Sequence, residues 1–149
     1  MADYRTLNID GLEWGIRDSS GGTAIPTSDF EYLAITIDTS AAAEPADGDT
    51  DGLTWHLTSA TENEDVVIAS VYALSADNSR VGFKRTGHTW IRTDDASPED
   101  NMRDKVVSST TIGACQAHAT LGSHRIEGYR SRTLADGTTS VNEYWLKWD

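Results

Sequence analysis

Alternation of apolar and polar residues is the feature that most restricts the fold of this chain. Leu33, Ile35 and Ile37 alternate with smaller or more polar residues, and residues 53–58 repeat the pattern. Because successive side chains of a strand point to opposite faces, both segments are predicted to be half-buried strands. Residues 66–76 have apolar side chains at both the odd and the even positions, which indicates a central strand that is covered on both faces.

Turn residues and one helix start divide the second half of the chain. Residues 76–79 and 135–138 have the composition of hairpin turns. Ser97 followed by proline and two acids predicts the start of a short helix over Pro98–Val106. A longer helix that reaches Leu121 is the alternative, but the alternation around Cys115 favours strands there.

These elements predict a mainly β fold, an antiparallel β-sandwich or barrel of about nine strands with one short helix. The length of 149 residues fits a single domain over residues 1–149. The longest irregular stretch, Thr39–Gly52, is an acidic loop between strands. A loop of this length in a compact domain is usually functional or disordered.

Composition points to a high-salt environment. The chain has 16 Asp but only 3 Lys, and its formal net charge is −12. Self-repulsion of this size destabilises a compact fold unless molar salt screens it. No basic leader and no run of 18 apolar residues is present, so we expect a soluble protein without a membrane segment, made in the cytoplasm.

The net charge is concentrated in one half of the chain. Residues 1–79 contain 15 acidic and 2 basic residues, whereas residues 80–149 contain 9 acidic and 10 basic ones. This polarity favours head-to-tail association of identical subunits, although it also fits one half simply being the more solvated surface. The residues expected at subunit contacts are Asp47, Asp49, Asp51, Arg80, Arg85, Arg92, Arg125, Arg130 and Arg132.

One segment resembles the opening of a calcium-binding loop. Asp47, Asp49 and Asp51 precede Gly52 at the spacing of the first ligands and the turn glycine. The twelfth position is Thr58 rather than a bidentate glutamate, and the following residues have a strand pattern. The segment therefore predicts either a site for Ca²⁺ or another cation, or a solvated acidic loop, and no other cofactor is expected.

No catalytic residues are predicted. The single cysteine, Cys115, alternates with small apolar residues and is expected to be buried. Glu127 and Glu143 are a carboxylate pair of a kind that any acid-rich β domain offers. The four histidines have no recognised ligand spacing: His56, His88, His118 and His124.

Two binding functions remain open. Residues 83–92 and the later arginines mix bases with aromatic residues, which suits single-stranded nucleic acid. The overall acidity argues against that partner, because phosphate contacts weaken in salt, and we expect no sequence-specific nucleic-acid binding. Trp14, Trp145 or Trp148 on the surface would instead make a sugar-stacking platform, although core positions suit them as well.

At the level of architecture, the chain resembles tail-tube and related virion proteins. The shared features are a small β-sandwich, a long loop between early strands, here Thr39–Gly52, and one short helix. In that family, hexameric rings stack into a tube with an acidic lumen. The resemblance implies a virion protein of a halophilic virus, in which the loop contacts the next ring and other virion proteins are partners. A capsid decoration or turret protein fits as well, and a carbohydrate- or small-ligand-binding β-domain and a small hydrolase are the alternatives.

Overall fold

The computed structural model of the chain describes residues 12–17, 25–26, 28–38, 53–58, 68–122 and 124–148. The predicted mainly β fold is confirmed. The described residues form ten strands and one short 3-10 helix: β1 (Glu13–Arg17), β2 (Ala34–Asp38), β3 (Leu53–Leu57), β4 (Ile68–Leu74), β5 (Arg80–Lys84), β6 (His88–Thr93), η3 (Pro98–Asn101), β7 (Lys105–Ser108), β8 (Cys115–His118), β9 (Arg125–Thr133) and β10 (Ser140–Lys147). The predicted acidic loop, Thr39–Gly52, lies outside the described residues.

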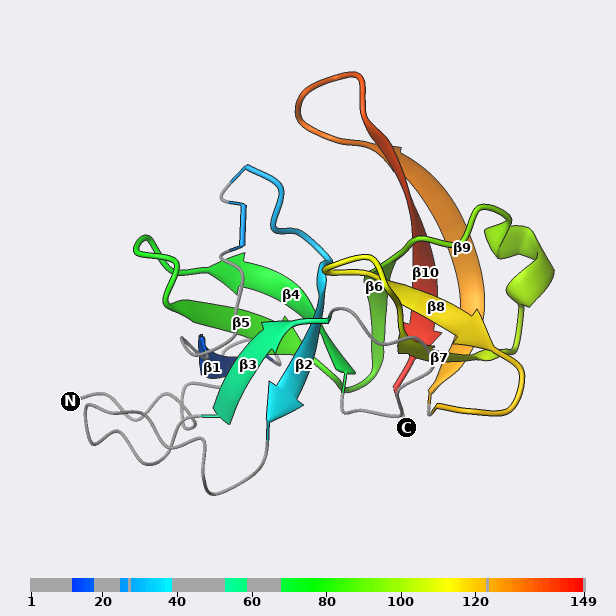
Figure 1. Cartoon of the computed structure of the whole chain (residues 1–149), viewed down its shortest axis with the longest axis horizontal. Helices are drawn as coiled ribbons and strands as arrows, with labels where there is room; N and C mark the ends of the chain where they lie inside the picture. The colour runs from blue at the N-terminus through cyan, green and yellow to red at the C-terminus, as the bar shows by residue number, and fades with distance from the viewer. Residues whose placement is uncertain are drawn as a thin grey trace.

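The first five strands form a small closed barrel in the order β1-β3-β2-β4-β5, and β5 pairs back onto β1 (Figure 1). Trp55 is fully buried inside, and its indole N–H donates to the Gly15 carbonyl of β1 at 3.1 Å. The remaining buried apolar residues of this core are Ile25, Leu33, Ile35, Leu57, Ala69, Val71, Val81 and Phe83. The sequence predicted antiparallel pairing throughout, but β1 runs parallel to β3.

The last five strands form an open sheet in the order β7-β8-β6-β10-β9. A second parallel contact joins β6 to β8 at a single position, Thr93 opposite Cys115. The nine-residue strand β9 lies at the edge and pairs with β10 alone. Their hairpin projects beyond the rest of the molecule in Figure 1.

The barrel and the open sheet share a second apolar core. Ala34 and Ile68 point out of the barrel and pack against buried residues of the sheet. Strand β4 is therefore buried on both faces over its first four residues, as the sequence predicts for residues 66–76. The sheet contributes Ile91, Val106, Cys115, Ile126, Tyr144, Leu146 and Trp148.

The predicted helix over Pro98–Val106 is much shorter in the structure. Only Pro98–Asn101 is helical, as one 3-10 turn. Arg103 adopts a positive φ of 72°, and its N–H donates to the Ile126 carbonyl at 2.8 Å. The Ile126 N–H donates to the Asp104 carbonyl at 2.9 Å. The backbone beyond residue 102 is thus bonded to β9 and is not available to continue a helix.

Candidate functional site

The most elaborate group of polar and aromatic side chains lies where the barrel meets one face of the open sheet. Two cross-strand rows of the sheet supply most of it, because residues directly opposite in paired strands share a face. Trp90, Trp145 and Gly128 form one row, and Arg92, Glu143 and Arg130 form the next. We call the group the arginine–aromatic cluster; its members are Tyr32, Tyr72, Lys84, Trp90, Arg92, Arg130, Arg132, Glu143 and Trp145.

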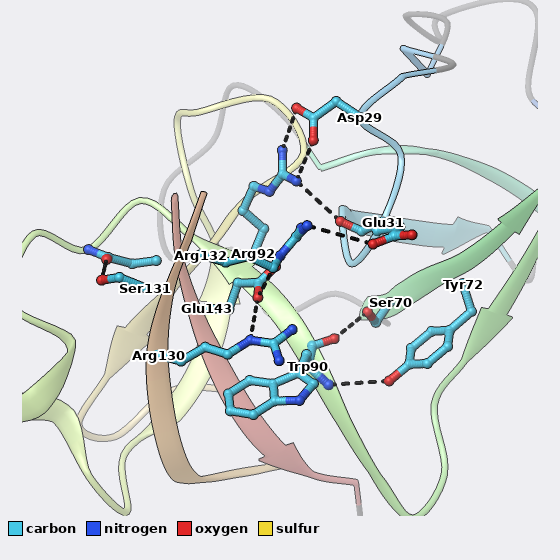
Figure 2. A network of polar contacts seen from close by, with 11 residues as sticks. Asp29, Glu31, Ser70, Tyr72, Trp90, Arg92, Arg130, Ser131, Arg132 and Glu143 are labelled. Atoms are coloured by element: carbon cyan, nitrogen blue, oxygen red, sulfur yellow. Dashed lines mark hydrogen bonds and ion pairs between the residues drawn. The ribbon is translucent and has the colours of Figure 1, made fainter. Parts of the chain in front are cut away.

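A buried carboxylate holds the cluster together. The side chain of Glu143 is 0% exposed, and two arginines of the neighbouring strand bind it (Figure 2). Arg130 Nε donates to Oε1 at 2.7 Å, while Arg132 reaches Oε2 through Nε at 3.1 Å and through Nη2 at 3.0 Å. A buried charge is stable only when it is paired and hydrogen-bonded, which this geometry provides.

A third arginine ties the turn before β2 to the sheet. Arg92 makes a bidentate ion pair with Asp29, with nitrogen–oxygen distances of 3.0 and 2.9 Å. Its Nη2 also donates to the Glu31 carbonyl at 3.2 Å, and its backbone N–H donates to the Tyr32 carbonyl at 2.7 Å. Figure 2 shows Arg92 reaching across to Asp29 beside the Arg132–Glu31 pair.

Aromatic rings and cations alternate through the cluster. The Arg130 guanidinium lies 3.9 Å from the centre of the Trp90 ring, and Trp90 in turn contacts Trp145 at 5.0 Å between ring centres. On the barrel side, Tyr32 meets Tyr72 edge to face at 5.2 Å. Such contacts are worth about 0.5–1.5 kcal/mol each beyond the apolar area that they bury. They join the two β units electrostatically as well as by packing.

The sequence explains this local arrangement at two places. Gly128 lies opposite Trp145, and a β-carbon at Gly128 would come within 3.2 Å of the Trp145 β-carbon. A shift of register between Trp145 and Leu146 then turns Ile126 into the apolar core on the opposite face. One strand therefore serves both the cluster and the core.

Exposed basic residues extend the same face beyond the tryptophans. Arg125, Lys147 and His88 lie opposite one another in three neighbouring strands, and all three are exposed. His88 stacks on Trp145 with ring planes 13° apart and contacts Glu127 at 2.9 Å. We call Arg125, Lys147 and His88 the basic row.

The structure places the predicted contact arginines mostly in ion pairs within the chain. Arg85 pairs with Glu13 at 2.9 Å, and Arg92, Arg130 and Arg132 belong to the cluster. Arg125 is exposed in the basic row, whereas Arg80 begins β5 and donates to the Ser79 hydroxyl. At least four of the six arginines thus have acidic partners within the described part of the chain, and their contact with another subunit stays a prediction. Asp47, Asp49 and Asp51 lie outside the described residues.

The histidines and the cysteine have structural roles where their side chains are described. His118 Nδ1 accepts from the backbone N–H groups of the following turn, and the His124 ring lies 4.5 Å from that of Trp148. Burial raises the pKa of the Cys115 thiol well above its usual range, and Asp95 and Asp94 add to that effect. A thiol of this kind is not a nucleophile at neutral pH. His56 lies in β3.

Sequence reasoning missed the role of Glu143 as the centre of the cluster. The signal was present in the predicted hairpin around residues 135–138. Counting outward from that turn puts Arg130 opposite Glu143, and the chain pairs in that register. A carboxylate opposite an arginine, with a second arginine two residues along the same strand, predicts a cross-strand ion pair.

The buried carboxylate of the cluster is not placed to act as a general acid or base. Both Glu143 oxygens are bound by arginine, so the carboxylate is not free to transfer a proton. Within the described ranges, no three His, Cys, Asp or Glu side chains are grouped as metal ligands. The same part of the chain contains no helix long and apolar enough to span a membrane.

Comparison with known proteins finds no match: no family model, no curated protein and no solved structure matches this chain.

Proposed function

We propose that this chain is a non-enzymatic structural protein that self-assembles, with the free edge of β9 as one contact between copies. The finer proposal is a virion component of a halophilic virus, either a ring subunit of a tail tube or a capsid decoration protein. The Asp-rich, Lys-poor composition supports the high-salt setting. The edge of β9 is the observation that carries self-assembly.

The hydrogen-bond phase of the hairpin shows which backbone groups of β9 point outward. Leu134 N–H donates to the Thr139 carbonyl at 2.8 Å, which makes this a hydrogen-bonded pair. Because bonded and non-bonded pairs alternate in antiparallel strands, the backbone groups of Tyr129, Ser131 and Thr133 point away from β10. Among the described residues, β9 makes backbone bonds on that side only at Ile126.

The outer part of this edge, residues 129–133, lacks lysine and proline, and the β-bulge of the strand lies further along, between Ile126 and Gly128. Natural edge strands carry outward lysines, prolines or covering loops, but β9 contains neither lysine nor proline. Its two central arginines, Arg130 and Arg132, turn toward Glu143 instead of shielding the edge. Tyr129 is 48% exposed beside the free backbone groups. Such a strand is suited to pair with a strand of another copy.

Edge-blocking variants test self-assembly. Ser131→Pro removes an outward N–H without removing a bond to β10, and Tyr129→Lys adds an edge charge. We expect the wild type to form oligomers in molar KCl by light scattering, and both variants to shift toward monomer. Thr86→Lys, in the exposed turn after β5, is the control and should assemble like the wild type. A wild type that stays monomeric at every concentration would refute the proposal.

Electron microscopy of the assemblies addresses the finer proposal. Stacked rings with a central channel support a tail tube, whereas small closed oligomers support a decoration or turret protein. Assemblies with no fixed symmetry contradict both, because virion components form closed or helical symmetric arrays.

A carbohydrate- or small-ligand-binding function is the second candidate, because Trp90 and Trp145 lie side by side on one sheet face. Arg130 covers one face of Trp90 and His88 stacks on Trp145, which leaves less free ring area for a sugar. A shallow cleft lined by residues 28–31, Arg132 and residues 134–135 is the place for a small ligand. Tryptophan fluorescence titrated with oligosaccharides distinguishes this function, since an ordered sugar stacked on either ring would change its emission.

A further inference from the structure

We infer that copies of this chain associate head to tail, with the basic row of one copy receiving the acidic turn of the next. The inference rests on the proposed self-assembly and names a second surface, apart from the edge of β9. It follows from where the described structure leaves charged side chains without an ion-pair partner.

Three arginines of the open sheet are already neutralised, whereas Arg103, Lys105, Arg125 and Lys147 make no ion pair with a described residue. Arg92, Arg130 and Arg132 form ion pairs with Asp29 and Glu143. The basic row differs, since neither Arg125 nor Lys147 makes an ion pair with any described residue, and both are exposed. Its third member, His88, pairs with Glu127. The result is a basic face beside Trp145 on a protein of net charge −12.

A matching acidic surface lies around η3. Residues 94–105 contain five acids and two bases, and we call the exposed Glu99 and Asp100 within them the acidic turn. Neither carboxylate has an ion-pair partner among the described residues. The turn is held in place from the sheet, because Asn101 Nδ2 donates to the Tyr144 hydroxyl at 2.8 Å and that hydroxyl donates to Asp95 at 2.5 Å.

The two surfaces are carried on opposite sides of one sheet. Tyr144 and Trp145 are consecutive in β10, so their side chains point to opposite faces. The basic row shares the face of Trp145, since Lys147 is two residues further along and Arg125 lies opposite it. The acidic turn is bonded to Tyr144 on the other side. The two patches therefore lie on different sides of the sheet, where each can meet a different copy.

This geometry predicts a heterologous contact. Each copy uses a different patch on its two partners, and repetition of such a contact generates a ring or a filament. In molar salt the attraction acts only at contact distance, because the Debye length falls to about 3 Å. Unlike charges at contact, next to an aromatic side chain, still confer specificity by excluding a copy that arrives with like charges.

Charge reversal in two separate chains tests this contact. Chain one carries Arg125→Glu and Lys147→Glu, and chain two carries Glu99→Lys and Asp100→Lys. Either chain alone should assemble at least about tenfold more weakly than the wild type in molar KCl. An equimolar mixture should recover assembly, because each reversed surface now meets an oppositely reversed one. That recovery also shows that both variants are folded.

The control variant changes charge equally but outside the basic row, at two bases in the same segment, 94–105, as the acidic turn. Arg103→Glu with Lys105→Glu adds the same negative charge as chain one, and both positions are exposed. We expect it to assemble at least as well as the wild type. If the wild type assembles and chain one assembles equally well, or if the mixture does not recover, the head-to-tail contact is wrong while self-assembly stands. A wild type that is monomeric throughout refutes both.

Discussion

Replacing Glu143 by glutamine measures what the buried carboxylate contributes to the fold. The variant keeps the shape and one carbonyl oxygen for Arg130 but replaces Oε2, which accepts from Arg132 at 3.1 and 3.0 Å. Each hydrogen bond to a charged group is worth about 1.5–3 kcal/mol. The arginine side chains are 33% and 24% exposed, so water recovers part of that loss.

We expect a net loss of about 2–4 kcal/mol in the free energy of unfolding, or about 5–15 °C in Tm for a chain of this size. Urea unfolding in molar KCl, followed by tryptophan fluorescence, measures it. Glu127→Gln is the matched control, because that carboxylate faces His88 with both side chains 35–41% exposed and should contribute less than about 1 kcal/mol. If the two variants lose the same stability, the cluster is not a buried ionic centre and the reasoning fails.

Three further measurements follow from the structure. A β-carbon at Gly122, where φ is +91°, would lie 2.2 Å from the Val106 carbonyl oxygen, so Gly122→Ala should lower the free energy of unfolding by at least about 2 kcal/mol. Gly137 has a φ of +76° but open space around it, so Gly137→Ala should lower it by about 1 kcal/mol. Equal losses in urea unfolding would contradict the steric explanation. Hydrogen bonds from the hydroxyl and N–H groups of its turn lower the pKa of Asp136 from 3.8 to about 2; the stabilisation is therefore present above pH 3.8 and lost as the pH falls through 2, and Asp136→Asn should flatten the pH dependence of Tm in that range. Burial raises the pKa of Cys115, so iodoacetamide should label the native protein far more slowly than the urea-unfolded chain, and similar rates would show that the thiol is accessible.

Local sequence signals predicted most of the strands and the two hairpins, β4–β5 and β9–β10, but not the pairing of strands that are distant in sequence. The turn at residues 76–79 works as its composition indicates, because Asp77 accepts hydrogen bonds from the hydroxyls of Ser75 and Ser79. The parallel pairing of β1 with β3 has no such local signal, since the contact depends on the whole barrel closing. Ser97 is a favoured capping residue, yet its side chain makes no capping bond, and bonding of the next segment to β9 leaves only one helical turn.

For the candidate site, the residue types were predictable but their partners were not. The arginines from Arg80 onward were predicted at subunit contacts, which stays a prediction; within the chain, Arg85 meets Glu13 and Arg92 meets Asp29. The partners in these pairs are 72 and 63 residues apart in sequence, so no local spacing pattern predicts them. The acids of the first half and the arginines of the nearly neutral second half attract each other within one molecule.

Closure of the barrel has a consequence for the order of events during synthesis. Strand β1 leaves the ribosome before the other described strands, but both of its partners, β3 and β5, come later, and β5 ends only at Lys84. The β9–β10 hairpin, by contrast, contains both of its strands within one short segment and forms from local contacts. Trp55 donates from inside the barrel to the backbone of β1, so in a variant that keeps Trp55 as its sole tryptophan the emission reports when the first strand has joined.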